Sequence, residues 1–236
     1  MATRSVAWLV TGGGTGLGRE IARQAAAGGA RVAVNYSRSR EAAEATAREI
    51  GGIAIQGDVA GEAQRVVDAA AGALGGLDVL VNNAGATVHV PFADLDGISE
   101  ADWDRIMAVN VRAAFVASRA AARHGVASIL NVASVAGLHP RGSSLAYSVS
   151  KAALIHLTRG LAVALAPRTR VNAVAPGWLD TPWWQGRGNI ERASAATLLG
   201  HVPTVADTAA AAISLILNES VTGQVLPVDS GANLHW

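Results

Sequence analysis

Short apolar runs alternate along this chain with longer stretches in which apolar residues recur at helical spacing. The short runs are nearly continuous in Val, Ile, Leu and Ala, without the polar alternation of a half-exposed strand. Such runs are typical of parallel strands that helices cover on both faces. They predict strands at Ala7–Thr11, Arg31–Tyr36, Ile53–Gln56, Val79–Asn82, Ser128–Ala133, Arg170–Ala175 and Gln224–Val228.

The alternation predicts one doubly wound α/β domain over residues 1–236, with a seven-stranded parallel sheet and helices on both faces. Residues 178–201 break the rhythm, because they combine Trp, Gly and Pro with little clear periodicity. The expected helices are Leu17–Ala27, Ser39–Ile50, Glu62–Ala73, Ala101–His124, Ala146–Ala166 and Val205–Leu217.

The composition excludes several classes of function. Half of the 236 residues are hydrophobic and 16% are charged, so one domain with a large core is possible. The net charge is +1 and no basic run appears, which gives no support for nucleic-acid binding. Because there is no cysteine, disulfides, thiol catalysis and zinc–thiolate sites are excluded.

Neither a membrane span nor a secretion signal is visible in the sequence. No apolar run reaches the ~18 residues that a membrane helix needs. The first residues, Met1–Ser5, lead directly into the first predicted strand. We therefore expect a cytoplasmic protein with no membrane partner.

A glycine cluster follows the first strand and reads Thr11-Gly12-Gly13-Gly14-Thr15-Gly16-Leu17-Gly18. Glycine permits a tight turn and a close approach of the backbone to a ligand. The start of the following helix offers unpaired N–H groups and a positive dipole end to a phosphate. A flexible turn is the alternative, but a strand before the cluster and a helix after it favour a dinucleotide pyrophosphate site.

Three residues in the second half of the chain have a spacing that suits proton transfer. Tyr147 and Lys151 are four residues apart, so they lie on one face of a helix, and Ser134 precedes them. An ammonium beside a phenol favours the phenolate, so we expect Lys151 to lower the pKa of Tyr147 from about 10. By itself a Tyr-x-x-x-Lys spacing arises by chance on many helices, and Ser134 alone reads as a turn serine.

Taken together, these motifs resemble the short-chain dehydrogenase/reductase family, in its 3-oxoacyl-reductase-like subgroup. The resemblance covers essentially the whole chain and implies a Rossmann-type fold. Further matching segments are Asp58-Val59, Asn82-Asn83-Ala84-Gly85, Pro176-Gly177 with Thr181, and Val221-Thr222-Gly223-Gln224 leading to Val228-Asp229-Ser230-Gly231.

The resemblance implies an NAD(P)-dependent oxidoreductase that interconverts a carbonyl and an alcohol. It assigns a catalytic tetrad to Asn110, Ser134, Tyr147 and Lys151. Tyr147 is then the general acid or base, Ser134 stabilises the substrate oxygen, and Lys151 also binds the nicotinamide ribose. Asn110 resembles the residue that supports a proton-relay water.

The same resemblance implies the cofactor contacts. Asp58 and Val59 match the pair that meets the adenine, although Asp58 also suits an N-cap for the next helix. Asn82 and Asn83 have the alternative of simply closing a strand end. The implied cofactor residues are Thr11, Gly12, Gly14, Thr15, Gly16, Leu17, Gly18, Asp58, Val59, Asn83, Ala84, Gly85, Tyr147, Lys151, Pro176, Gly177, Leu179 and Thr181.

The end of the second strand indicates which dinucleotide binds. Members that prefer NAD usually place an acid there to bind the ribose 2′-hydroxyl, and this chain has none. Ser37, Arg38 and Ser39 stand there instead and suit a 2′-phosphate, because the arginine fork matches phosphate. We expect NADP, with NAD possible. The alternative is that Arg38 and Arg40 are solvated residues that open the next helix.

The substrate is expected beyond the carboxyl ends of the strands. Lining candidates are Thr87, His89, Leu138, His139, Trp178, Trp183 and Trp184. Three tryptophans in seven residues indicate an apolar or aromatic wall, in the segment 178–201 where the family places a substrate lid. Ordinary packing or an oligomer contact is the alternative for them.

Assembly and two competing functions remain open at this stage. The resemblance implies a homodimer or homotetramer, and the predicted helix Ala146–Ala166 is apolar on more than one face. A non-redox enzyme of the same fold, such as an epimerase or lyase, is one competing function. A nucleotide-sensing regulatory protein is the other, although a sensor does not need Ser134, Tyr147 and Lys151.

Overall fold

The computed structural model describes residues 5–181 and 189–234, which form one seven-stranded sheet. All neighbouring strands are parallel, in the order β3-β2-β1-β4-β5-β6-β7. This confirms the predicted doubly wound sheet. The strands are β1 (Ala7–Val10), β2 (Arg31–Tyr36), β3 (Ile53–Gln56), β4 (Val79–Asn82), β5 (Ser128–Val132), β6 (Arg170–Pro176) and β7 (Val225–Val228).

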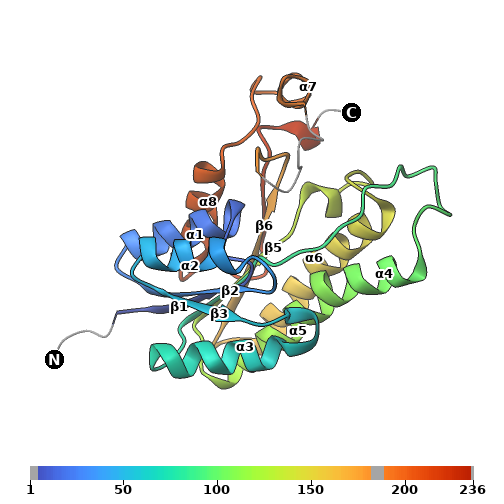
Figure 1. Cartoon of the computed structure of the whole chain (residues 1–236). Helices are drawn as coiled ribbons and strands as arrows, with labels where there is room; N and C mark the ends of the chain where they lie inside the picture. The colour runs from blue at the N-terminus through green and yellow to red at the C-terminus, as the bar shows by residue number, and fades with distance from the viewer. Residues whose placement is uncertain (1–4, 182–188, 235–236) are drawn as a thin grey trace.

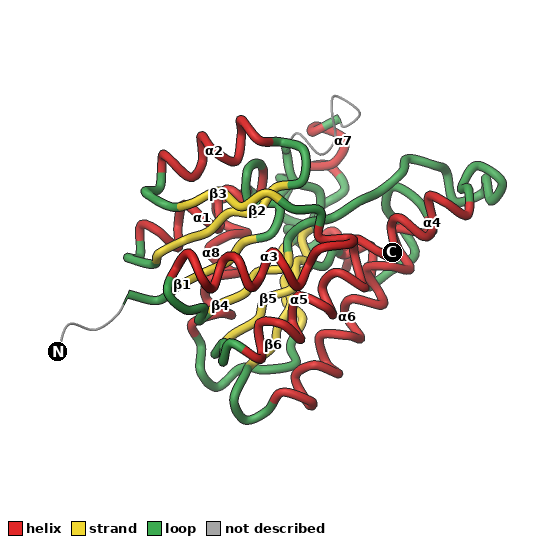
Figure 2. The backbone as a smooth tube through the Cα atoms, turned by 60° about the horizontal axis from the view of Figure 1, so that its bottom comes forward, coloured by secondary structure: helices red, strands yellow, loops and turns green. Residues whose placement is uncertain are grey.

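Helices cover both faces of this sheet. The α-helices are α1 (Gly16–Ala27), α2 (Arg40–Glu49), α3 (Val59–Leu74), α4 (Glu100–Met107), α5 (Ala113–Arg123), α6 (Leu145–Leu165), α7 (Ile190–Ala195) and α8 (Val205–Leu217). Helices α1, α2 and α8 pack on one face, and α3, α5 and α6 pack on the other (Figure 1). Helix α4 and the loop before it extend away from the sheet (Figure 2).

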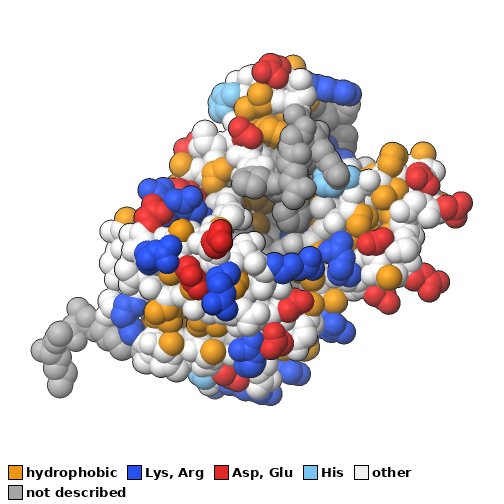
Figure 3. Space-filling view, in the orientation of Figure 1, with side chains coloured by type: hydrophobic (Ala, Val, Ile, Leu, Met, Phe, Trp, Pro, Cys, Tyr) orange, Lys and Arg blue, Asp and Glu red, His pale blue; other side chains and the backbone are white. Residues whose placement is uncertain are grey.

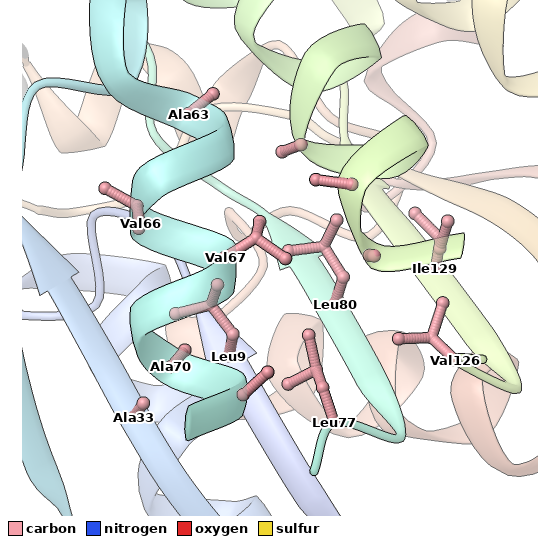
Figure 4. Close-up of a cluster of buried hydrophobic side chains, with 14 of the residues drawn as sticks. Leu9, Ala33, Ala63, Val66, Val67, Ala70, Leu77, Leu80, Val126 and Ile129 are labelled. Carbon is pink, nitrogen blue, oxygen red and sulfur yellow. The ribbon is translucent and has the colours of Figure 1, made fainter. Parts of the chain in front are cut away.

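Apolar side chains fill the space between the sheet and each helical layer. On the α3 side, Leu9, Leu80 and Ile129 of three neighbouring strands pack in one buried cluster with Val67 and Ala70 of α3 (Figure 4). Burial of a side chain such as Leu or Ile stabilises the fold by about 1.5–3 kcal/mol. The cluster gives the loops at the strand ends a rigid support.

Two predicted helices differ from those in the structure. The single helix expected over Ala101–His124 is interrupted by a π-helical segment, η1 (Ala108–Arg112), between α4 and α5. Helix α3 begins at Val59 rather than Glu62, because the Asp58 carboxylate accepts a hydrogen bond from the Ala60 N–H and caps the helix.

The region without periodicity is also more regular than the sequence indicated. It contains α7, whose N-cap Asn189 accepts a hydrogen bond from the N–H of Arg192 at 2.6 Å. Short 3₁₀ turns follow β5 and β7, at η2 (Val135–Gly137) and η4 (Ala232–Leu234). Among residues 5–181 and 189–234, no helix is long and apolar enough to cross a lipid bilayer.

Candidate active site

The glycine loop joins β1 to α1 and is tied to the end of β4. The Thr11 hydroxyl accepts hydrogen bonds from the backbone N–H groups of Asn83 and Ala84, at 3.0 and 3.1 Å. The Asn83 amide donates in return to the carbonyl oxygens of Thr11 and Gly12, at 2.9 and 3.0 Å. The side chain of Asn83 therefore joins two loops at the carboxyl edge of the sheet.

The glycine loop leaves no room for side chains at several positions. A Cβ on Gly18 would collide with the Asn83 amide and lie 2.6 Å from the carbonyl oxygen of Gly12. A Cβ on Gly14 would lie 3.0 Å from the backbone nitrogen of Ala43 in α2. Gly12 has a φ of +62°, in the left-handed region that favours glycine. These residues are glycines because the backbone itself forms the surface of the loop.

The start of α1 fits an anionic group. Thr15 caps this helix without a side-chain hydrogen bond, and the first turn carries no acidic residue. No carboxylate in the first turn of α1 therefore neutralises the positive end of the helix dipole. A Cβ on Gly16 would lie 3.6 Å from the Cβ of Thr181, so the segment after β6 lies opposite the loop. This arrangement fits the pyrophosphate of a dinucleotide.

Ser134 and Tyr147 meet at the carboxyl end of β5. Ser134 follows this strand and caps η2, where its hydroxyl accepts a hydrogen bond from the Ala136 N–H at 3.1 Å. Tyr147 lies in the first turn of α6, which Ser144 caps by accepting the Tyr147 N–H at 3.2 Å. The side chains of Ser134 and Tyr147 are hydrogen-bonded to each other. The structure thus brings together two residues that are 13 positions apart in the sequence.

The predicted lowering of the Tyr147 pKa by Lys151 is wrong. Burial raises the pKa of Tyr147 to about 12, although the hydrogen bond with Ser134 acts to lower this pKa. Burial also lowers the pKa of Lys151, to about 8. The Lys151 ammonium donates to the carbonyl oxygen of Val132 at 2.8 Å. Desolvation of Tyr147 therefore outweighs the nearby Lys151 charge in setting the pKa of Tyr147. The helical spacing of the two residues predicts the charge effect but not the desolvation.

Asn110 lies inside the π-helical segment η1 and is fully buried. Its Oδ1 accepts from the Ala86 N–H at 2.7 Å, and its Nδ2 donates to the Ala86 carbonyl and the Ser150 hydroxyl, both at 2.9 Å. Ser150 donates onward to the carbonyl oxygen of Tyr147 at 2.7 Å. Asn110 thus links the loop after β4 to helix α6. The relay-water role of Asn110 stays a prediction.

The end of β2 lies beside the glycine loop. The carbonyl oxygen of Asn35 accepts a hydrogen bond from the Gly13 N–H at 3.1 Å. Ser37, Arg38 and Ser39 follow with exposed side chains, and Ser39 precedes α2 without capping it through its hydroxyl. The predicted 2′-phosphate residues and the predicted pyrophosphate loop are therefore neighbours in the fold.

Figure 3 shows basic and acidic side chains interspersed over α1 and α2, where all of them are Arg or Glu. Arg40, at the start of α2, lies 3.7 Å from Glu44 and fits the alternative of a solvated helix-opening residue. Asp58, the other predicted adenosine contact, is exposed and caps α3. Its adenine contact, like that of Val59, stays a prediction.

Hydrogen bonds join two loops that are predicted to line the substrate pocket. The hydroxyls of Thr87 and Ser143 lie 2.5 Å apart, and the Val90 N–H donates to the Ser143 carbonyl at 2.9 Å. These bonds hold the loop that carries His89 against the loop that carries His139. The structure thus brings two predicted substrate segments together.

The segment after β6 divides between core and surface. The Leu179 side chain is buried in the cluster on the α1 side of the sheet, and its predicted cofactor contact stays a prediction. Trp178 is partly buried. Trp183 and Trp184 lie outside the described residues, and their substrate contacts stay predictions.

Sequence reasoning missed several residues that position the site. Ser144, Ser150 and Ser143 hold the start of α6 and its loop through the contacts above. A serine directly before the apolar helix, at Ser144, was a recognisable N-cap signal. The contacts of Ser143 and Ser150 join segments far apart in the sequence, and a local pattern does not reveal them.

Comparisons with known proteins agree with this geometry. A family model described as short chain dehydrogenase matches residues 6–191. A protein of Streptomyces violaceoruber, named as ketoacyl reductase 2 of the granaticin polyketide synthase, is 42% identical over 96% of this chain and 95% of its own length. 3beta-Hydroxysteroid dehydrogenase 1 of Eggerthella lenta is 38% identical over 96% of this chain and 93% of its own.

Solved structures show the same fold. A short chain dehydrogenase from Burkholderia cenocepacia, in complex with NADP, is 38% identical and covers 98% of this chain and 100% of its own, with a TM-score of 0.89. A 3-ketoacyl-(acyl-carrier-protein) reductase from Brucella melitensis, complexed with NADH, is 32% identical with a TM-score of 0.89 and covers 97% and 98%. Both relatives match nearly the whole of this chain.

Proposed function

This chain belongs to the short-chain dehydrogenase family, and on that premise we propose that Tyr147 is the general acid or base of its reaction. The protein is an NAD(P)-dependent oxidoreductase that interconverts a carbonyl and an alcohol. The observation that carries the proposal is the hydrogen bond between Ser134 and Tyr147 at the carboxyl edge of the sheet, one helical turn from the buried Lys151.

Each residue of the site has a distinct task in this proposal. Tyr147 gives a proton to the substrate oxygen during reduction and removes it during oxidation. Ser134 donates a hydrogen bond to the same oxygen as negative charge develops on it. Lys151 adds a positive charge in a buried site, where it acts more strongly than in water. Asn110 holds the loop after β4 against α6.

A nicotinamide dinucleotide fits the glycine loop and supplies or accepts the hydride when bound. The N-terminus of α1 with Gly12, Gly14, Gly16 and Gly18 would hold its pyrophosphate. Gly177 and Thr181, after β6, would hold its nicotinamide end. We favour NADP, because Ser37, Arg38 and Ser39 lie beside the loop and the end of β2 carries no acid.

The substrate in this proposal is a bulky apolar or aromatic carbonyl compound. The support is the run of Trp178, Trp183 and Trp184 after the predicted carboxamide segment. The polyketide reductase name of the Streptomyces relative fits such a substrate. A substrate lid over residues 178–201 and substrate contacts by His89 and His139 belong to the same proposal.

We also propose a homodimer or homotetramer. Large apolar side chains are exposed along α4, α5 and α6: Trp103, Phe115, Val149 and Val163, of which Val163 is 83% exposed. Arg119 lies over the Phe115 ring, 5.7 Å from its centre. Large exposed apolar side chains on neighbouring helices are typical of a contact with a second copy. A cytoplasmic location is part of the proposal.

One experiment tests the reaction. Purified protein is screened with NADPH and NADH against a panel of carbonyl compounds, and the loss of nicotinamide absorbance is followed. Wild type is expected to turn over at least one bulky ketone, and Tyr147→Phe to lose at least ~10²-fold in turnover while it still binds cofactor. The matched control is Tyr36→Phe, since Tyr36, in β2, is the only other tyrosine of the chain.

The outcomes separate the competing functions. Near-normal turnover in a folded Tyr147→Phe would contradict the mechanism. Cofactor binding without absorbance change on any carbonyl would favour an epimerase, a lyase or a nucleotide sensor.

A further inference from the structure

Asp229 is a buried carboxylate immediately after β7, and it organises the end of the described chain. It is 5% exposed. Its Oδ1 accepts from the Gly231 N–H at 3.0 Å, and its Oδ2 accepts from the Asn233 N–H and the Asn233 side-chain amide, both at 2.7 Å. Three donors therefore converge on one carboxylate. These bonds fold residues Asp229–Leu234, here termed the C-terminal segment, into a tight turn.

The turn is tight enough to force an unusual backbone conformation. Ser230 has a φ of +53°, and it is the only non-glycine residue with a positive φ in residues 5–181 and 189–234. Gly231 follows with a φ of +81°. A serine in the left-handed region persists only where its surroundings hold it there, and such residues concentrate at functional sites. The carboxylate of Asp229 is the group that holds this one.

The C-terminal segment touches the predicted nicotinamide turn on one side. The Gly177 N–H donates to the carbonyl oxygen of Val228 at 2.9 Å. A Cβ on Gly177 would lie 2.7 Å from the Cβ of Asp229, so the two backbones are in direct contact. The position of Gly177 therefore depends on where Asp229 stands.

The same segment touches both predicted walls of the substrate pocket. The Leu199 N–H, after α7, donates to the carbonyl oxygen of Ser230 at 3.2 Å, and a Cβ on Gly231 would lie 2.8 Å from the Cβ of Leu198. Arg141, in the loop between Ser134 and Tyr147, donates to the carbonyl oxygen of Ala232 at 3.2 Å. Figure 1 shows the red C-terminal segment close to α7, above the carboxyl end of β6.

We propose that Asp229 is a positioning residue that sets substrate specificity, because its carboxylate holds the C-terminal segment as a bridge between α7 and the loop of Arg141. It acts through backbone contacts and touches no reacting atom. The expected change in substrate specificity rests on the proposed reductase function. The expected loosening of the segment around Leu199 rests on the contacts alone.

The chemistry requires a carboxylate at this position. Every described partner of the side chain is an N–H donor, and two of them share Oδ2. In Asp229→Asn, one oxygen becomes an NH₂ group that opposes those donors, and the negative charge is lost. Adding Asn233→Asp supplies an acceptor for the new amide, so the double variant restores the side-chain contact.

Hydrogen exchange tests the structural link without any substrate. In cofactor-free Asp229→Asn, amides of residues 197–200 are expected to exchange at least ~10-fold faster than in wild type, because a charge-assisted bond that holds their partner segment is lost. The double variant is expected to recover part of this protection. The matched control is Asp96→Asn, the same chemical change at an exposed position in the loop before α4.

Kinetics test the effect on specificity, with ethyl acetoacetate and ethyl benzoylacetate as a small and a bulky substrate. The ratio of their kcat/KM values is expected to shift at least ~10-fold in Asp229→Asn, mostly through KM, while the Kd of NADPH changes less. Arg141→Ala is expected to shift the ratio in the same direction. The two changes together are expected to be less than additive, because they loosen the same bridge.

The outcomes are distinct. A role in stability alone predicts a lower melting temperature with unchanged exchange at residues 197–200 and an unchanged substrate ratio, and this result overturns the proposal. Faster exchange with an unchanged ratio also overturns it. Should Asp229→Asn fail to fold, an unchanged ratio in Arg141→Ala overturns it. If wild type reduces neither ester, the reductase proposal fails for these substrates, and the exchange experiment alone decides the link.

Discussion

The ammonium nitrogen of Lys151 lies 5.6 Å from the centre of the Tyr147 ring and donates its hydrogen bond to the carbonyl oxygen of Val132. The lysine therefore interacts with the face of the tyrosine ring and with strand β5. Lys151 is buried and Tyr147 is partly buried, and their removal from water favours the neutral form of each. Tyr147 is therefore a neutral phenol at neutral pH.

The ionisation of Tyr147 is open to direct measurement, because the chain has only two tyrosines. We expect the ultraviolet difference between wild type and Tyr147→Phe to show no phenolate from Tyr147 below pH 10, since its pKa is about 12. An oxidised nicotinamide adds positive charge, so NADP⁺ is expected to lower this pKa. A phenolate signal near pH 8 without cofactor would contradict the dominance of burial.

The buried Lys151 is expected to lower stability at neutral pH. Its pKa falls from 10.5 to about 8 on burial, and the buried ammonium then costs about 3 kcal/mol. The hydrogen bond to Val132 offsets ~1 kcal/mol of this cost. Lys151→Met is therefore expected to be more stable than wild type at pH 7 by about 2 kcal/mol, and to lose turnover.

The stability difference between wild type and Lys151→Met is expected to depend on pH. Between pH 8 and 10.5 the unfolded chain binds more protons at Lys151 than the folded one, so wild type gains stability as pH rises. Its deficit relative to Lys151→Met is expected to shrink over that range in urea titrations. Tyr147 is present in both proteins, and its own titration cancels. A deficit independent of pH would show that Lys151 acts through packing.

The sheet could be predicted from the sequence because buried parallel strands leave a strong local pattern. The bounds of β2, β3 and β4 match the expected ranges, and the other strands differ at one end. The order of the predicted catalytic residues was equally visible. Their surroundings were not, since the pKa of Tyr147 depends on burial and on the contact with Ser134, which only the fold creates.

The features that the sequence did not predict share a physical cause. The π-helical segment spans only five residues, too few for its period to be told from that of an α-helix, so it has no clear signature in the sequence. The bonds of Asp229 are local, but its importance lies in the contacts of its segment with Gly177, Leu199 and Arg141. Contacts between distant segments emerge only from the fold.

The glycine loop offers a test of close backbone packing. In Gly18→Ala the new Cβ meets the Asn83 amide and the Gly12 carbonyl, which hydrogen bonds hold in place. We expect a loss of about 1–3 kcal/mol in stability and weaker cofactor binding. Gly72→Ala is the control, because Gly72 is exposed within α3 with no atom near a new Cβ. It is expected to be neutral or stabilising by up to ~1 kcal/mol. Stability is measured by urea unfolding and cofactor affinity by calorimetry. Equal changes in Gly18→Ala and Gly72→Ala would show that the glycine loop can shift to accept the new Cβ.

We expect the preference between the two cofactors to depend on Arg38. This residue follows a strand end without an acid, and Asn35, three positions earlier, binds the glycine loop through its carbonyl oxygen. A charge-assisted hydrogen bond contributes about 1.5–3 kcal/mol, or roughly 10- to 150-fold in affinity. NADPH is therefore expected to bind at least ~10-fold tighter than NADH. Salt is expected to narrow this gap, because it screens an exposed charge pair.

Calorimetric titration of the free enzyme with both cofactors decides the matter without a known substrate. Arg38→Ala is expected to weaken NADPH at least ~10-fold and to leave NADH nearly unchanged, because only the 2′-phosphate distinguishes them. Arg40→Ala is the matched control, since Arg40 is equally exposed but faces Glu44 at 3.7 Å along α2. Equal affinity for the two cofactors, or the same loss in both variants, would mean that Arg38 is a solvated residue at the start of the helix. If NADPH still binds tighter than NADH in Arg38→Ala, the preference must come from the hydroxyls of Ser37 and Ser39, which Ser37→Ala and Ser39→Ala would then reveal.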